Sequence, residues 1–252
     1  MGQRKVAMNK KYSFLHHDHD PQSIQERILS QSKSVLRDFV YGAIDGAVTT
    51  FAIVAGVAGA NLETRTVLIL GFANVLADGF SMAASNYLAT KSELEERMLV
   101  TQYEEEQIEI NSEGETEEIR QIFINKGITG STLDELVTQI TSDKKEWLKV
   151  MLAEEYGYTN REQSPLKAGL VTFSSFAIFG LIPLIPYMIL TNGNFFWSTI
   201  FTGIAFFSAG AAKTQWTRHS LWRSGFETLL IGSLAALLAY YAGAILSNMN
   251  FL

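Results

Sequence analysis

The chain has 252 residues, of which 47% are hydrophobic, and its formal net charge is −6. An acidic chain lacks the basic surface that nucleic acid needs, and the absence of cysteine excludes disulfides, thiolate metal sites and a cysteine nucleophile. Charge is concentrated before Asp38 and between Lys91 and Lys167, and the remainder is apolar enough for membrane spans.

The first 37 residues are polar and contain no short apolar run with a cleavage site, so we expect no signal peptide here. We interpret residues 1–37 as a cytoplasmic N-terminal arm. Within it, His16–Asp20 holds three of the four histidines of the chain. Histidine-rich tracts can bind metal, and the alternative is a flexible polar arm.

Five later segments have roughly 20 mostly apolar residues, the length that crosses a bilayer. They are Phe39–Ala60, Val67–Ala89, Leu166–Leu190, Phe195–Ala212 and Phe226–Leu246. Lysine and arginine cluster in the N-terminal arm, between the second and third segments, and between the fourth and fifth, which places these parts on one side. We therefore predict a multi-pass protein with a cytoplasmic N-terminus and an extracytoplasmic C-terminus. Because no organelle-targeting pattern is evident, we expect it in the cell membrane.

The predicted fold is all-α, with a helical domain inserted between two groups of spans. Residues 38–90 form transmembrane helices 1 and 2, residues 91–164 form the cytoplasmic helical domain, and residues 165–252 form transmembrane helices 3–5. Inside the insert we predict helices over Ser92–Ile110, over Glu115–Asn125, from a capping box at Ser131, and over Lys144–Tyr156.

Polar residues recur inside the first two predicted spans, where an ionised group costs a few kcal/mol. At about 3.6 residues per turn, those of each span fall on one helix face. The first set is Asp38, just before the first span, with Asp45 and Thr49 inside it, and the second set is Asn74 and Asp78 with the thioether of Met82 in line. Such residues usually face a bundle interior or an aqueous path, and the alternative is that the aspartates only hydrogen-bond between helices.

Asp45 and Met82 each lie about 10 Å from the cytoplasmic end of their span at 1.5 Å per residue. If the two spans pack face to face, the two side chains therefore meet at one level. A carboxylate paired with a thioether favours Fe²⁺, and Co²⁺ or Mn²⁺ more weakly, over Mg²⁺ and Ca²⁺. A carboxylate in a low dielectric also holds its proton tightly, so it can exchange a proton for a metal. For Met82 the alternative is a packing side chain.

Eleven glutamates lie between Glu93 and Glu118 in the predicted insert. Like charges this close repel one another, and a bound cation would relieve the repulsion. Met151 and Glu155 lie four residues apart, on one side of the last predicted helix. We hypothesise that the insert gathers metal and passes it to the membrane path. The alternative is a solvated acidic face, with Met151 an ordinary core residue.

Three separated motifs resemble the vacuolar iron transporter family: Asp45-Gly46, the stretch Ser81–Glu93 and the stretch Gly180–Tyr187. The resemblance runs from about Asp38 to the C-terminus and suggests a bacterial or archaeal member. It implies a five-helix homodimer that exports cytosolic Fe²⁺, often also Mn²⁺, in exchange for protons. It also implies a transport site made of Asp45 and Met82, with Asp38 at the cytoplasmic mouth.

The resemblance further implies metal ligands in the insert. The residues at the family's ligand positions are Glu104, Glu115, Glu118, Met151 and Glu155. The chain departs from the expected pattern at Gln107, where a glutamate is expected, and at Leu152, where a second methionine is expected. In the second span Asn74 takes the place of a glutamate, and Asp78, one turn away, would supply the lost charge.

Two functions compete on this evidence. The first is a metal/proton antiporter, whose partners are divalent metal ions, protons, the lipid bilayer and a second copy of the chain. The second is a non-transporting membrane metal sensor or scaffold. Only transport requires a carboxylate at the depth of Asp45, so the sequence favours transport. No nucleophile–base set, phosphate loop or cofactor motif occurs, so we expect neither an enzyme nor a prosthetic group.

Overall fold

The computed structural model describes residues 20–29, 35–158, 163–190, 195–215 and 220–249. Within these ranges the chain is helical and contains no strand, which confirms the predicted all-α class. A short helix, α1 (Pro21–Leu29), precedes the rest, and Asp20 caps it by accepting from the backbone N–H groups of Gln22 and Ser23.

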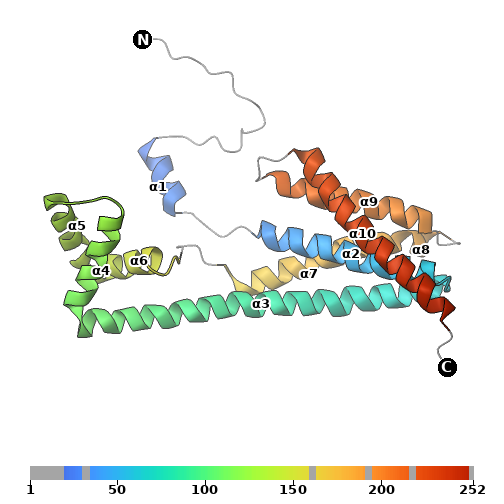
Figure 1. Cartoon of the computed structure of the whole chain (residues 1–252), viewed down its shortest axis with the longest axis horizontal. Helices are drawn as coiled ribbons and strands as arrows, with labels where there is room; N and C mark the ends of the chain where they lie inside the picture. Colours follow the sequence, from blue (N-terminus) through green and yellow to red (C-terminus); the bar gives the residue numbers. More distant parts are fainter. Residues whose placement is uncertain (1–19, 30–34, 159–162, 191–194, 216–219, 250–252) are drawn as a thin grey trace, which may run out of the picture.

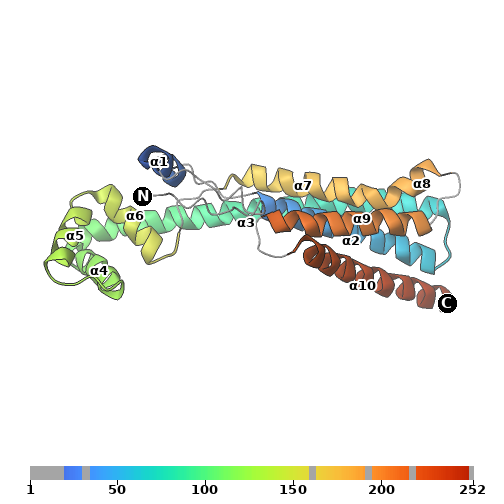
Figure 2. The same cartoon turned by 90° about the horizontal axis from the view of Figure 1, so that it is seen from above.

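Five helical segments are long and apolar enough to cross a membrane, in agreement with the five predicted spans. They are α2 (Leu36–Gly59), α3 (Thr64–Ile110), the third span Pro165–Ile189, α9 (Phe195–Ala212) and α10 (Leu221–Asn248). The segment α2 lies in the middle of the bundle and packs against the four others (Figures 1 and 2). The described part of the chain therefore has the helices expected of a multi-pass membrane protein.

The second span and the charged stretch after it form one uninterrupted helix, α3, of 47 residues. At 1.5 Å per residue it is roughly 70 Å long, more than twice the thickness of a bilayer core. No glycine or proline occurs between Phe80 and Ile110, and Lys91 pairs with Glu95 one turn later at 3.5 Å. The helix therefore continues unbroken past Ala89, where its composition changes from apolar to charged. Figure 2 shows α3 carrying the insert away from the bundle.

The third span is broken, where the sequence predicted one helix over Leu166–Leu190. It consists of α7 (Pro165–Leu181), the 3₁₀ turn η2 (Ile182–Leu184) and α8 (Ile185–Ile189). Pro183 and Pro186 lack the backbone N–H that would continue the helix. The hydroxyl of Ser198 on α9 donates to the Pro183 carbonyl at 2.7 Å, so this carbonyl has a hydrogen-bond partner at the break. A further 3₁₀ turn, η3 (Lys213–Gln215), follows α9.

The insert contains α4 (Ser112–Asn125), α5 (Ser131–Thr141) and α6 (Lys144–Glu154), which lie beside the far end of α3 (Figure 1). Of these, α4 and α6 pack against α3, and α5 packs against α4 and α6. The core of the insert consists of Ile108, Ile119, Leu133, Val137, Trp147, Leu148 and Met151. Asn111 ends α3 and caps α4 through Gly114, and Asp143 caps α6 through Lys145. The predicted capping box is wrong, because Gly130 with φ 68° precedes α5 and no side chain caps that helix.

Glycines let α2 approach the third span closely. A Cβ added at Gly46 would overlap the backbone carbonyl of Phe176 on α7. From the other side, Gly180 lies against Thr50 and Val75, which belong to α2 and α3. The three helices therefore meet at one level, and this crossing places the polar residues of α2 and α3 opposite each other.

Candidate functional site

A chain of hydrogen bonds joins α2 to α3 inside the bundle. The Thr49 hydroxyl donates to the Asp45 carbonyl one turn earlier at 2.9 Å. The amide of Asn74 donates to the hydroxyls of Thr49 at 3.2 Å and Thr50 at 3.4 Å. Asp45, Thr49 and Asn74 are all partly buried. The polar faces that the sequence assigned to the two spans therefore meet, at least from Asp45 to Asn74.

Two carboxylates lie at this level, one on each helix. Asp45 is half-buried, and Asp78 is close enough for the two negative charges to repel each other. Asp78 itself is exposed on the surface of a single chain. A pair of carboxylates in apolar surroundings favours a proton or a cation between them. Met82, partly buried, lies one turn beyond Asp78 on α3, and its sharing of an ion with Asp45 stays a prediction.

Asp38 lies at the end of the bundle nearest the insert and is only 4% exposed. Its two oxygens accept hydrogen bonds from the side-chain amides of Asn86, at 3.1 Å, and of Gln163. The Asn86 amide also contacts the Thr172 hydroxyl at 2.8 Å and the Ala168 carbonyl at 3.4 Å. This network ties α2, α3 and α7 together around one buried carboxylate, and the role of Asp38 at the mouth of a cation path stays a prediction.

Asn86, Gln163 and Thr172 belong to this site and were not among the predicted site residues. Asn86 follows Met82 by four positions, so the spacing that linked Asn74, Asp78 and Met82 already included it. Thr172 lies in an apolar segment and Gln163 in an expected loop. Neither gave a signal in the sequence.

A second set of acidic residues lies in the insert, around the core of α3, α4 and α6. Glu104 and Glu115 are 2% and 5% exposed, and the Oε2 atom of each is buried without a hydrogen-bond partner. The other oxygen of Glu104 accepts the hydroxyl of Tyr156 at 2.6 Å. Met151 is fully buried. Buried carboxylate oxygens without partners are costly, and a bound cation would remove that cost.

The carboxylates of this set influence one another strongly. Burial, together with the charges of Glu118, Glu104 and Glu155, raises the pKa of Glu115 to about 7. Burial and the same neighbours Glu118 and Glu104 raise the pKa of Glu155. The predicted ligands Glu104, Glu115, Glu118 and Glu155 therefore lie within one electrostatic neighbourhood. Glu118 and Glu155 are exposed, and among the described residues no three acidic or histidine side chains converge tightly enough to form a metal site.

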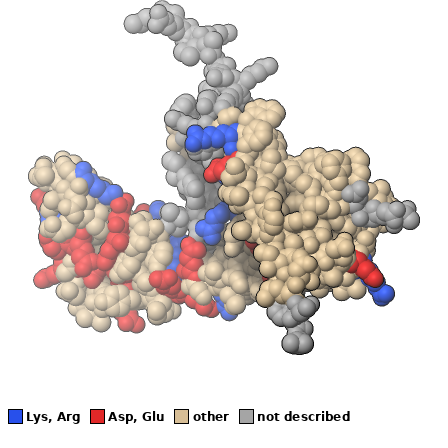
Figure 3. All heavy atoms as spheres, turned by 45° about the vertical axis from the view of Figure 1, so that its right-hand side comes forward, with Lys and Arg blue, Asp and Glu red and all other residues tan. Residues whose placement is uncertain are grey.

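Other glutamates of the acidic stretch behave as a solvated face. Glu109 pairs with Lys144 at 2.6 Å and Glu95 with Lys91 at 3.5 Å, both on the surface. Figure 3 shows acidic side chains spread over the insert, while the visible face of the bundle is nearly free of charge. The alternative reading of the stretch thus fits these residues, and it does not fit the buried Glu104 and Glu115.

Three further features of the sequence were singled out: Gln107, Leu152 and the histidine-rich tract. Gln107 is partly buried, and Leu152 is an 8% exposed apolar residue. Of the histidine-rich tract His16–Asp20, only Asp20 lies within the described residues, so metal capture there stays a prediction.

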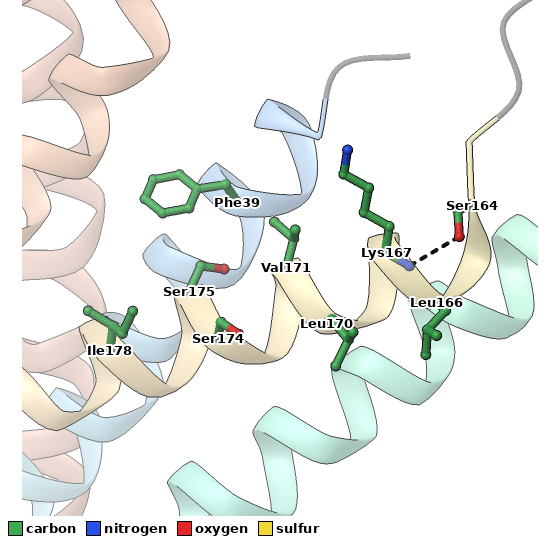
Figure 4. A pocket seen from close by; sticks show the side chains of 9 residues that line it. All are labelled: Phe39, Ser164, Leu166, Lys167, Leu170, Val171, Ser174, Ser175 and Ile178. Atoms are coloured by element: carbon green, nitrogen blue, oxygen red, sulfur yellow. Dashed lines mark hydrogen bonds between the residues drawn. The ribbon is translucent and has the colours of Figure 1, made fainter. Parts of the chain in front are cut away.

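A groove on the outer side of α7 lies apart from both sets of acidic residues. Its volume is about 420 Å³, and Phe39 of α2 and Leu170, Val171 and Ile178 of α7 contribute to its walls (Figure 4). Lys167 is the charged residue of its lining, which contains no carboxylate. A cation would therefore have no charged ligand in this groove.

Five apolar helices, with a half-buried carboxylate beside hydrogen-bonded polar residues of the first two and a buried carboxylate at their insert-side end, define a polytopic membrane protein with polar groups inside its bundle. The sequence profile of the VIT family matches residues 36–244. The chain belongs to this family, whose members are transporters and not enzymes.

Named relatives cover most of the chain. The vacuolar iron transporter of Plasmodium berghei is 33% identical over 234 residues, 87% of this chain and 85% of the relative. Vacuolar iron transporter 2 of Oryza sativa subsp. japonica is 32% identical over 210 residues, covering 82% and 85% of the two chains. Vacuolar iron transporter 1 of Arabidopsis thaliana is 30% identical over 217 residues, covering 85% and 87%.

Proposed function

We propose that this protein exports a divalent transition metal, Fe²⁺ or Mn²⁺, from the cytosol in exchange for protons. The observation that carries the proposal is Asp45, a half-buried carboxylate on α2 that is joined to α3 through Thr49 and Asn74, within helices that can span a membrane. An ionisable residue at this depth is expensive to maintain and usually marks an ion path. The relatives named as iron transporters support iron as the cargo.

Exchange follows from the chemistry of a carboxylate in low dielectric. Such a group is stable when it binds either a proton or a metal cation, and the two compete for it. Asp45 would bind the metal with Met82, whose thioether adds preference for softer cations such as Fe²⁺. Thr49 donates to the Asp45 carbonyl, and Asn74 of α3 donates to the Thr49 hydroxyl, so both lie next to Asp45.

The path would begin at the insert, on the cytosolic side. Glu104 and Glu115 offer unpartnered oxygens, Met151 offers a sulfur, and Glu118 and Glu155 are exposed and can move toward a cation. The metal would pass from there to Asp38 and then to Asp45. This direction agrees with the basic residues of the insert and the N-terminal arm, which favour the cytosolic side of a cell membrane.

A homodimer would cover the exposed face of α3. Ala73, Ala77, Ser81 and Ser85 recur every four residues on that face, and all four are exposed in a single chain. Small residues at this spacing let two membrane helices pack closely. Asp78 lies beside the stripe, where contact with lipid would be costly, so a second copy would bring both Asp78 carboxylates into the protein interior.

Metal flux in proteoliposomes tests the proposal. We expect the purified protein to move Fe²⁺ or Mn²⁺ in competition with each other but not with Mg²⁺ or Ca²⁺, and Asp45→Ala to abolish this flux. Glu227→Gln is the matched control, because Glu227 is a carboxylate on a spanning helix that pairs with Lys213 at 3.6 Å, away from the path. Metal binding without flux in the wild-type protein would instead identify a sensor or scaffold.

A further inference from the structure

Tyr156 makes the direct hydrogen bond that joins the end of α6 to the buried carboxylate on α3. Its hydroxyl donates to Glu104 Oε1 at 2.6 Å, between residues 52 positions apart in the sequence. A phenol hydroxyl is a hydrogen-bond donor, so this bond holds one oxygen of the Glu104 carboxylate.

The two oxygens of the Glu104 carboxylate differ in their hydrogen bonding. Oε1 accepts from Tyr156, while Oε2 is buried and has no partner, as is Oε2 of Glu115. In metal sites, a donor that binds one atom of a ligand fixes the orientation of the atom that meets the metal. Oε2 of Glu104 is therefore the oxygen left free for a cation.

The turn after α6 holds Tyr156 in this position. Gly157 has φ 73°, a conformation that glycine adopts without strain, and the backbone N–H of Tyr158 donates to the Leu152 carbonyl at 2.8 Å. The ring of Tyr158 stacks on that of Tyr156, with centroids 6.2 Å apart and planes 8° apart. The turn and the stacking therefore support the Tyr156 ring in the position from which its hydroxyl reaches Glu104.

We propose that Tyr156 is a positioning residue for the metal site of the insert: its hydroxyl holds Oε1 of Glu104 so that Oε2 faces the cation. Glu115 and Glu155 repel Glu104, and without the hydroxyl that repulsion would turn the carboxylate away from them. The inference rests on the proposed metal-binding role of the insert and names a residue that acts through a ligand.

The test is Mn²⁺ binding by the full-length purified protein, measured by calorimetry in an Asp45→Ala background that removes the membrane site. We expect Tyr156→Phe to weaken binding about 10-fold or more, the usual effect of losing such a partner. We also expect it to alter the electron paramagnetic resonance spectrum of the bound Mn²⁺. Tyr158→Phe is the control, because it removes a hydroxyl from the stacked ring and leaves the bond to Glu104 intact.

The outcomes separate this inference from the function beneath it. If Tyr156→Phe binds Mn²⁺ as well as the parent while Glu104→Gln does not, the positioning role is wrong and the metal site stands. If the two phenylalanine variants weaken binding equally, the tyrosines only support the turn and the inference fails. If Glu104→Gln also binds normally, the metal-binding role of the insert is wrong, and the positioning role with it.

Discussion

At the scale of single residues, the chain separates carboxylates that are solvated from carboxylates that are not. Asp38, Glu104 and Glu115 are each at most 5% exposed, whereas Glu109 and Glu95 pair with lysines on the surface. A buried carboxylate needs hydrogen bonds, a proton or a cation. Asp38 obtains two amide donors, while Glu104 and Glu115 each keep one oxygen without a partner. The buried carboxylates of the insert are therefore less completely hydrogen-bonded than Asp38 is.

The raised pKa of Glu115 predicts how pH acts on the metal-free insert. Its pKa rises from 4.5 to about 7 on folding, so the folded state binds the proton more tightly than the unfolded state. The stabilisation from this group is complete below pH 4.5 and is lost as pH rises to about 7. After correction for the intrinsic pH dependence of amide exchange, the amides of α4 and α6 should accordingly be better protected at pH 5 than at pH 8.

Glu115→Gln provides the comparison for this pH effect. The variant cannot ionise at this position, so its exchange rates, corrected for intrinsic chemistry, should change less between pH 5 and pH 8 than those of the wild type. Added Mn²⁺ should protect the wild-type insert more at pH 8, where the carboxylate is ionised. The same pH dependence in both proteins would show that Glu115 does not control it.

At the scale of elements, the close contact of α2 with α7 positions the path. Gly42 and Gly46 lie where an added Cβ would overlap atoms of the third span, and Gly180 meets Thr50 from the opposite side. The Asn74 bonds to Thr49 and Thr50 lie at this crossing. Separation of α2 from α7 would therefore shift the polar residues of α2 relative to those of α3.

Gly46→Ala tests the importance of this crossing. The new methyl group would overlap the carbonyl of Phe176, so the helices must move apart, at a cost of about 1–3 kcal/mol. We expect a lower melting temperature in detergent and slower metal flux. Gly203→Ala is the control, because its Cβ would meet only Leu229 at 3.6 Å, an ordinary contact. Equal melting temperatures for the two variants would contradict this view of the crossing.

At the scale of the whole molecule, the spans could be predicted from the sequence because their lengths and apolar composition are set by the bilayer. The polar faces of α2 and α3 were also predictable, since four-residue spacing places Asn74, Asp78 and Met82 in line. The break at Pro183 could not be predicted, because membrane helices tolerate proline when neighbouring residues supply hydrogen bonds, as Ser198 does here. Contacts such as that of Tyr156 with Glu104 join residues far apart in the sequence, so no periodic pattern in the sequence predicts them.

The assembly of two copies through α3 gives a prediction at the same scale. Because the natural chain has no cysteine, a single introduced cysteine reports one contact. We expect Ala77→Cys, on the small-residue stripe, to form a disulfide-linked dimer in membranes under mild oxidation. Leu238→Cys, on the exposed face of α10, should remain monomeric on the same gel. Cross-linking at position 238 and not at 77 would place the interface on α10 instead.

The central claim is that a metal and protons exchange at Asp45. Its most direct test records Fe²⁺ movement and internal pH together in proteoliposomes with an imposed pH gradient. The account predicts that metal and protons move in opposite directions, that a proton ionophore slows metal accumulation, and that Asp45→Ala abolishes both movements. Metal transport that continues in Asp45→Ala, or that ignores the pH gradient, would contradict it.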